Sequence, residues 1–199
     1  TQKQHKSGVA KAMDQSVFNQ FQSMIEATMA TGEAAAEPIA ISAEKIASAL
    51  LGGNTIFTCA SGPGTSIAQL FSDYLAFGYH IDRPAFPVIN LNQITAQHTN
   101  DDRFSQALNA HGKGGDILVL ISAGDSAAAL IDGFNTAVNR GMTVVVLSGE
   151  NDDLLTSAVS YNDIHIGNGG LSGPLTTQSQ LQVIQCISAL VENFIFGGE

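Results

Sequence analysis

The residues best suited to chemistry in this sequence lie in two short loops rich in glycine and serine, Ala60–Ser66 and Ile121–Ser126. Each loop follows a short apolar run and precedes apolar residues at helical spacing, so each is expected to join a strand to a helix. Such a turn presents backbone N–H groups, hydroxyls and the positive end of a helix dipole to an anion. Two such turns in one parallel sheet lie side by side at its carboxyl edge, where open α/β sheets bind ligands. The sequence therefore predicts a site for a phosphorylated ligand.

The candidate phosphate-binding groups are hydroxyls and backbone amides of these loops. They belong to Ser61, Gly62, Gly64, Thr65, Ser66, Ser122, Gly124 and Ser126. The first loop lacks the third glycine of a dinucleotide-binding fingerprint and the lysine of a Walker A loop, so an ordinary strand-to-helix turn is the alternative. In the second loop, Asp125 would repel a bound phosphate unless it turned away to cap the following helix.

Other chemistries have less support in the sequence. The histidines are dispersed, with no His-x-x-x-His or Glu-x-x-His pair, so neither a metal centre nor a cofactor is predicted. His165 is expected to be a hydrogen-bonded residue of an edge strand, whereas His98 is the best titrating candidate near the ligand edge. Spacing assembles no Ser-His-acid triad, and no Gly-x-Ser-x-Gly motif is present. No catalytic residue is therefore assigned from spacing alone.

Composition limits the classes of partner. The chain has 199 residues, of which 13% are charged, and its net charge is −10. Typical proteins contain about 25% charged residues, so part of this surface is expected to be covered by another subunit, unless the plentiful Gln, Asn, Ser and Thr solvate it. The acidic balance disfavours direct binding to nucleic acid or to an anionic membrane. Cys59 and Cys186 are expected to be reduced and buried, which fits a cytoplasmic location.

Hydrophobic periodicity predicts the elements that position the two loops. Residues 1–13 are expected to be disordered and 14–52 to form two helices, the second beginning near Pro38, which either cap the sheet or form a dimer. From 53 to 196, apolar strands alternate with amphipathic helices, which indicates an α/β core with a parallel sheet covered on both faces. The expected strands are 54–59, 86–91, 116–122, 144–147 and 162–167, and the expected helices are 65–77, 101–111, 126–139, 152–158 and 175–195.

Several motifs occur in a characteristic order and spacing over roughly residues 15–196. They are Phe57–Gly62, Ala68–Phe71, Arg83–Asn92, Gly115–Ser122, Gly141–Val144, Leu147–Gly149 and Gln185–Asn193. Together they resemble the sugar isomerase (SIS) domain family, in particular phosphoheptose isomerases and the bacterial DnaA initiator-associating protein. The resemblance implies a single SIS domain over 1–199, a three-layer αβα sandwich with a five-stranded parallel sheet and two N-terminal helices. It also implies a homotetramer with a sugar-phosphate cleft near its subunit interfaces.

The resemblance also assigns roles within the loops. Ser122 and Ser126 fall on hydroxyl positions that hold phosphate in the family. Gly64 stands where the family has a serine, with Thr65 and Ser66 as neighbouring substitutes, and the second loop is one residue shorter than the family's. The isomerases use a His and a Glu on one helix, and a Gln and a His on the last helix, for metal binding and acid–base chemistry. At those positions this chain has Leu70, Tyr74, Thr177 and Gln185.

An aldose–ketose isomerisation needs a positioned base, which these four residues do not supply. We therefore expect a non-catalytic, cytoplasmic SIS-domain protein that binds a sugar phosphate and acts through protein contacts in replication initiation. The alternatives are a divergent phosphoheptose (sedoheptulose 7-phosphate) isomerase and a phosphosugar-sensing regulatory module. The expected partners are further copies of the chain, as a dimer or tetramer, and DnaA. Ile195 and Phe196 match the terminal Leu-Phe pair of the initiator-associating protein, although both residues would also suit packing within the oligomer.

Overall fold

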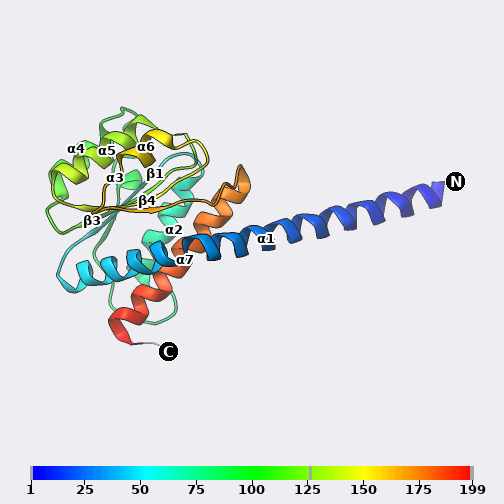
Figure 1. Ribbon diagram of the computed structural model, residues 1–199, viewed down its shortest axis with the longest axis horizontal. Coiled ribbons are helices and arrows are strands. Elements are labelled where there is room, and N and C mark those ends of the chain that lie inside the picture. Colours follow the sequence, from blue (N-terminus) through cyan, green and yellow to red (C-terminus); the bar gives the residue numbers. More distant parts are fainter. Residues whose placement is uncertain (1, 126, 198–199) are drawn as a thin grey trace.

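A computed structural model describes residues 2–125 and 127–197, with side chains from residue 13 onward. Its centre is a fully parallel five-stranded sheet with the strand order β2-β1-β3-β4-β5 (Figure 1). The strands are β1 (Ile56–Ala60), β2 (Val88–Asn90), β3 (Ile117–Ile121), β4 (Thr143–Leu147) and β5 (Ile164–Ile166). This arrangement confirms the expected α/β fold and parallel sheet.

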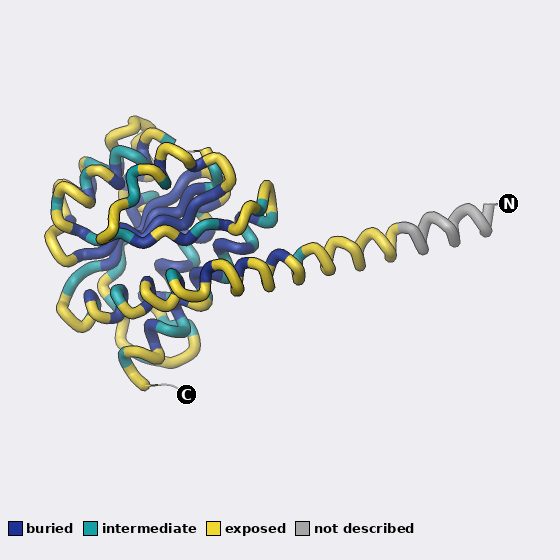
Figure 2. Tube along the Cα trace, in the orientation of Figure 1, coloured by how far each residue is buried: buried dark blue, intermediate teal, exposed yellow. Residues whose placement is uncertain are grey.

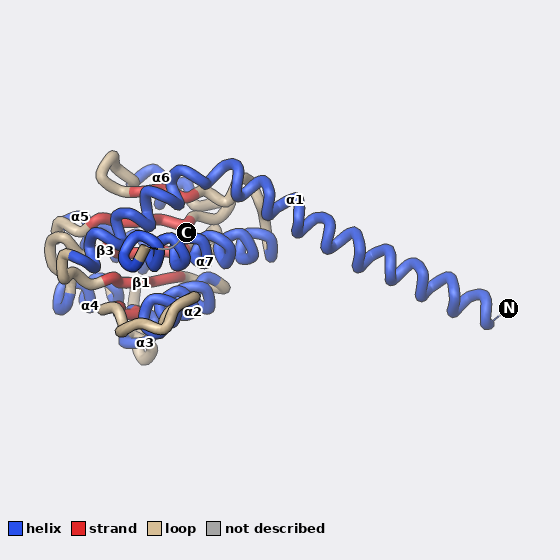
Figure 3. The backbone as a smooth tube through the Cα atoms, turned by 90° about the horizontal axis from the view of Figure 1, so that it is seen from below, coloured by secondary structure: helices blue, strands red, loops and turns tan. Residues whose placement is uncertain are grey.

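Helices cover both faces of the sheet (Figures 1 and 3). One layer contains α1 (Gln2–Leu51), α2 (Gly64–Phe77) and α7 (Pro174–Phe196), and the other contains α3 (Leu91–Ile94), α4 (Arg103–His111), α5 (Ala128–Asn139) and α6 (Asp153–Ala158). Alternate residues of β3 enter the two cores: Val119 packs in the first layer and Leu120 in the second. Burial on both faces explains why the strands are continuously apolar.

The N-terminal region differs from the two helices expected. A single helix, α1, runs from Gln2 to Leu51, and it includes residues 2–13, for which disorder was expected. Pro38 lies inside this helix rather than at the start of a second one. A proline inside a helix costs roughly 3 kcal/mol, because it removes a hydrogen bond and crowds the preceding turn. Ala35 and Ile39, on either side of Pro38, are both buried in the same core, so packing holds the two segments in one helix.

The two halves of α1 have different surroundings. The C-terminal half packs beside α7 and the sheet, whereas residues 13–23 are exposed and lie on a segment that extends away from the rest of the domain (Figure 2). Within the described residues, no helix is both long and apolar enough to cross a bilayer.

Two local expectations also need correction. Cys59 is buried as expected, but Cys186 is exposed. The reason is that α7 buries Val183, Ile184 and Ile187, and this spacing leaves position 186 on the opposite side of the helix. The strand expected at 86–91 is shortened to β2, because Asn90 caps a short helix, α3, with its side-chain oxygen.

Candidate phosphate-binding site

The structure places the two serine-rich loops side by side at the carboxyl edge of the sheet. Strands β1 and β3 are neighbours, with Ala60 paired with Ile121, so Ser61 and Ser122 directly follow paired strand ends. The Ser61 N–H donates to the Ile121 carbonyl at 3.2 Å, and the Ser122 N–H donates to the Leu147 carbonyl at 2.9 Å. The backbone of each serine is therefore fixed by a hydrogen bond to the next strand of the sheet.

The first loop is shaped by its glycines. Gly62 has a φ of +50°, a left-handed conformation that glycine adopts without strain. Gly64 is the first residue of α2 and is buried, and a Cβ at this position would lie 3.1 Å from the Ile121 carbonyl oxygen. The close packing of the two loops therefore favours glycine where the family has a serine. The Thr65 hydroxyl donates to the Gly62 carbonyl at 2.8 Å, so it stabilises the turn itself, and Ser66 is exposed.

An asparagine on the neighbouring segment holds the end of β1. Asn92 accepts a hydrogen bond from the Ala60 N–H at 2.9 Å and donates to the Ala60 carbonyl at 2.8 Å. Asn90 in turn accepts from the Asn92 N–H and donates to Gln69 on α2. Sequence reasoning did not assign this role to Asn92; a short polar side chain directly after a strand end was the available signal.

Two carboxylates contact the serines of the loops: Asp125 lies between the two loops, and Asp152, from the segment after β4, contacts the second. Asp125 Oδ1 accepts a hydrogen bond from Ser61 Oγ at 2.6 Å and lies 3.3 Å from Ser122 Oγ. Ser122 Oγ also donates to Asp152 Oδ1 at 2.7 Å, and Asp152 Oδ2 accepts from the Gly149 N–H at 2.5 Å. Asp125 is exposed, whereas Asp152 is only 1% exposed. The chain therefore places its own oxygen anions against the hydroxyls that were expected to bind a ligand.

This arrangement corrects the expected role of Asp125. Helix α5 begins at Ala128 with Ala127 as its N-cap residue, so Asp125 lies outside the helix and does not cap it. Gly124 has a φ of +100°, which turns the chain between Ser122 and Asp125. Ser126, the other candidate of this loop, lies outside the described residues.

A cleft of about 670 Å³ opens beside the two loops and the first turns of α7. Its walls are mainly apolar, and its polar side chains come from Thr177 and Gln178 on α7. Gln180, also on α7, donates to the Ser122 carbonyl at 2.6 Å and so holds this helix against the second loop. The remaining lining residues are Pro63, Ile67, Ala123, Gly173, Pro174 and Leu181. This volume is within the range of ligand-binding clefts, about 300 to 1,000 Å³.

The candidate residues outside the loops are placed apart from this cleft. His98 is exposed and lines a separate cavity of about 300 Å³ with Thr95 and Arg103. At the end of α7, Ile195 packs against the core, and the Phe196 ring stacks on Phe86 with 6.1 Å between ring centroids.

His165 is confirmed as a hydrogen-bonded residue of the edge strand β5. Its Nε2 lies 2.7 Å from Ser148 Oγ. Burial lowers the pKa of His165, and the nearby charge of Asp152 opposes this shift. The net effect favours the neutral imidazole.

The positions that carry metal and acid–base groups in the isomerases do not fit a metal here. Leu70 and Tyr74 are partly buried against the core, and the Tyr74 ring contacts the Tyr79 ring at a centroid distance of 4.7 Å. Thr177 and Gln185 supply neither imidazole nor carboxylate. Among residues 13–125 and 127–197, whose side chains the structure describes, no group of three or more His, Cys, Asp or Glu residues could hold a metal ion.

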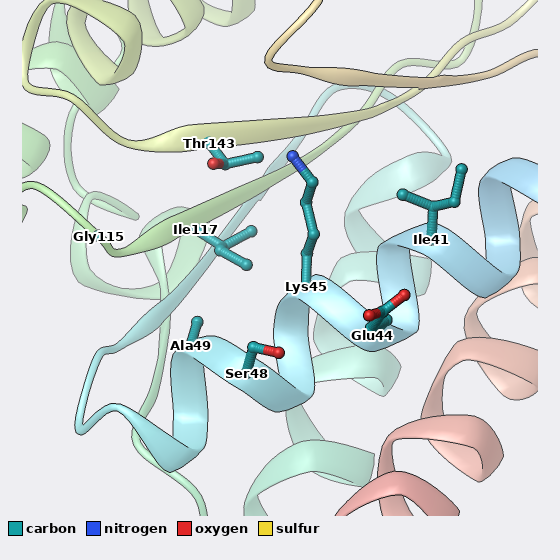
Figure 4. A pocket seen from close by; sticks show the side chains of 8 residues that line it. All are labelled: Ile41, Glu44, Lys45, Ser48, Ala49, Gly115, Ile117 and Thr143. Atoms are coloured by element: carbon teal, nitrogen blue, oxygen red, sulfur yellow. The ribbon is translucent and has the colours of Figure 1, made fainter.

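Another cavity lies at the opposite, amino edge of the sheet (Figure 4). It measures about 460 Å³ and lies between α1 and the starts of β3 and β4. Lys45 extends across it and donates to the Asn162 carbonyl at 3.2 Å. Because Ser61 and Ser122 are at the other edge, a ligand here cannot contact the serine loops.

Comparison with known proteins identifies relatives of the whole domain. The family model described as SIS domain matches residues 19–149. The chain is 32% identical over 187 residues to the phosphoheptose isomerase of Shewanella pealeana. The aligned region covers 90% of this chain and 95% of that protein. The corresponding protein of Shewanella oneidensis is 30% identical with the same coverage.

Solved structures show the same fold. The phosphoheptose isomerase of Francisella tularensis superposes with a TM-score of 0.83 at 22% identity, covering 92% of this chain and 98% of that one. The phosphoheptose isomerase of Neisseria gonorrhoeae gives a TM-score of 0.80 at 20% identity, covering 91% and 99%.

Proposed function

Because the chain belongs to the SIS domain family, we propose that it binds a phosphorylated sugar whose phosphate lies between Ser61 and Ser122. One observation carries this proposal: Asp125 Oδ1 lies 2.6 Å from Ser61 Oγ and 3.3 Å from Ser122 Oγ. An oxygen anion at this point is within reach of hydroxyls from two adjacent strand ends. A phosphate oxygen that replaced the carboxylate would accept the hydrogen of Ser61 and would lie beside Ser122. The positive end of the α2 dipole favours an anion at this edge.

The sugar would extend from the loops into the cleft along α7. There Thr177 and Gln178 can hydrogen-bond to sugar hydroxyls, while Pro63 and Leu181 contact the carbon skeleton. Gln180 would act indirectly, because its hydrogen bond to the Ser122 carbonyl fixes the second loop against the cleft.

A titration with sedoheptulose 7-phosphate tests the proposal. Ser61→Ala removes one hydroxyl that would donate to the phosphate, and a hydrogen bond to a charged group contributes about 1.5–3 kcal/mol. We therefore expect the Kd measured by calorimetry to rise by roughly tenfold or more. Ser23→Ala, on the exposed part of α1, is the matched control and should bind as the unchanged protein does. Absence of binding by the unchanged protein at millimolar ligand would refute the proposal.

The second candidate function is aldose–ketose isomerisation, and the relatives favour it. Several of them are named phosphoheptose isomerases and match nearly the whole domain. Such a reaction moves a proton between adjacent carbons and needs a base. Because Leu70, Tyr74, Thr177 and Gln185 replace the family's metal and acid–base groups, an isomerase of this sequence would have to use other residues. NMR spectra of sedoheptulose 7-phosphate with the purified protein decide the matter: formation of the aldose supports an isomerase, and binding without conversion supports a non-catalytic protein.

We also propose that further copies of the chain cover the extended part of α1. Its exposed apolar side chains lie on one side of the helix, at spacings of one, three or four residues. They are Met13, Val17, Phe18, Phe21, Ile25 and Met29, each at least 58% exposed. A stripe of this length is typical of a helix–helix interface. Together with the low fraction of charged residues, it favours a homo-oligomer.

If the protein is non-catalytic, we propose that it acts in replication initiation by binding DnaA. Phe196 is 47% exposed and Phe194 is 52% exposed at the end of α7. The two residues are two positions apart on α7 and so lie on opposite sides of the helix, where each ring offers a separate apolar contact to a protein partner. The contact between Phe196 and Phe86 supports the competing explanation, in which the end of α7 only stabilises the domain.

A further inference from the structure

We propose that Asp125 is a built-in competitor for the ligand's phosphate. Its carboxylate occupies the position between the two loops and must leave before a phosphate can bind there. This inference rests on the proposed function, since it concerns the regulation of the same site. The affinity for phosphate then depends on the exchange of the Asp125 carboxylate for the phosphate group.

The hydrogen atoms available at the site support this exchange. A serine hydroxyl has a single hydrogen to donate. Ser61 donates its hydrogen to Asp125 Oδ1 at 2.6 Å. Ser122 lies closer to Asp152 Oδ1, at 2.7 Å, than to Asp125 Oδ1, at 3.3 Å, so its hydrogen goes to Asp152. In this arrangement both hydroxyls would present only oxygen lone pairs to a phosphate.

The two carboxylates differ in their freedom to move. Asp152 is 1% exposed and is held by both the Ser122 hydroxyl and the Gly149 N–H, so moving it would leave buried groups unpaired. Asp125 is exposed, so its carboxylate can rotate into water, and the ligand's phosphate would then replace it as the acceptor for Ser61. When it does, the hydrogen of Ser61 becomes available to the ligand, and the negative charge moves away from the phosphate.

Close packing around Gly124 favours an exchange by the Asp125 side chain rather than by the backbone. Gly124 has a φ of +100°, and a Cβ there would lie 3.2 Å from the Glu150 nitrogen. A Cβ on Gly149 would lie only 2.4 Å from the Gly124 nitrogen. The second loop therefore packs closely against the segment after β4, and Gly124 fixes the point from which the Asp125 side chain reaches Ser61.

Binding of inorganic phosphate to Asp125→Asn tests this inference. The substitution keeps the size of the side chain but removes its charge, and a neutral amide accepts the Ser61 hydrogen more weakly than a carboxylate does. We expect the Kd for inorganic phosphate, measured by calorimetry, to fall by roughly tenfold, which corresponds to about 1.4 kcal/mol. Asp153→Asn is the matched control: it removes the same charge from an exposed residue at the start of α6 and should leave the Kd unchanged. Asp125→Ala repeats the test without any acceptor.

The outcomes separate this inference from the proposed function. Tighter phosphate binding in both Asp125 variants, with no change in Asp153→Asn, supports competition. Equal or weaker binding in the Asp125 variants, while the unchanged protein binds sedoheptulose 7-phosphate, overturns the inference and leaves the proposed site intact. An equal gain in Asp153→Asn also overturns it, because net charge alone would then explain the effect. If neither the unchanged protein nor any variant binds phosphate or the sugar phosphate, the proposed function fails and this inference fails with it.

Discussion

The buried ion pair between Arg83 and Glu192 joins the segment before β2 to α7, and its removal should destabilise the domain strongly. The two side chains are 2% and 3% exposed, and Arg83 Nε lies 3.0 Å from Glu192 Oε1. The Glu192 carboxylate also accepts hydrogen bonds from the backbone N–H groups of Tyr79, at 2.8 Å, and His80, at 2.9 Å. This segment leads to β2 and to Asn92, which holds the end of β1, so the contact also supports the candidate site.

The loss in the free energy of unfolding depends on which groups each substitution leaves unpaired. Glu192→Gln keeps one acceptor oxygen but leaves the Arg83 guanidinium buried without a counter-charge. Breaking a buried pair by removal of one partner costs about 3–5 kcal/mol. Arg83 keeps its hydrogen bonds to the Tyr74 and Leu75 carbonyls, so we expect a loss near the lower end, about 3 kcal/mol. Glu192→Ala also strands two N–H groups, and each unsatisfied group adds about 1–3 kcal/mol.

Urea unfolding followed by circular dichroism measures these losses. The protein concentration must be fixed, because assembly would shift the apparent stability. Glu44→Gln, an exposed position on α1, is the control and should change the free energy of unfolding by less than about 0.5 kcal/mol. If Glu192→Gln lowers the free energy of unfolding by no more than this control does, the reasoning from the buried pair is wrong.

The same residue predicts a dependence of stability on pH. Burial raises the pKa of Glu192, but the Tyr79 and His80 N–H groups and Arg83 outweigh it and hold the pKa below its ordinary value of 4.5. The unfolded chain therefore binds this proton more readily than the folded protein does. The contribution to stability is complete above pH 4.5 and is lost as the pH falls through the lower folded pKa. Urea midpoints measured below pH 4.5 should fall more steeply for the unchanged protein than for Glu192→Gln.

Three further predictions concern assembly, partners and cysteine chemistry. Phe21→Asp places a charge in the apolar stripe of α1 and should give a smaller species in light scattering; an unchanged mass would exclude this stripe from the interface. The double change Ile195→Ala and Phe196→Ala should abolish capture of DnaA while the oligomer persists; retained capture in a folded oligomer would show that these residues are not the contact. Cys186 is exposed and should react with iodoacetamide, whereas burial raises the pKa of the Cys59 thiol and should prevent its reaction until unfolding, as mass spectrometry can check.

The alternation of strands and helices could be predicted from the sequence because the sheet is covered on both faces. The run Ile117–Ile121 must be apolar at every position to fill two cores, and such a run is visible without a structure. The continuity of α1 could not be read in this way. Pro38 is typical of a helix start, and only the shared burial of Ala35 and Ile39 shows why the helix continues through it.

The sequence predicted the positions of the site's serines but not the contacts that their hydroxyls make. The positions of Ser61 and Ser122 follow from the strands that precede them. The contact between Ser122 and Asp152 joins residues 30 positions apart, and nothing in the local sequence indicates it. Asp125 was open to two interpretations, because its direction depends on whether α5 begins beside it or, as the structure has it, at Ala128.

Binding and catalysis depend on different parts of this fold, so one can persist without the other. Ser61 and Ser122 are positioned by hydrogen bonds to the neighbouring strands, and the identity of residues farther along α2 does not affect those bonds. Leu70 and Tyr74 lie on α2 and pack against the core, where apolar and aromatic side chains stabilise the domain more than a buried acid or base would. Substitutions at these two positions of α2 can therefore leave the two hydroxyls in place. For this reason affinity for a sugar phosphate does not establish turnover, and the two must be measured separately on the same protein.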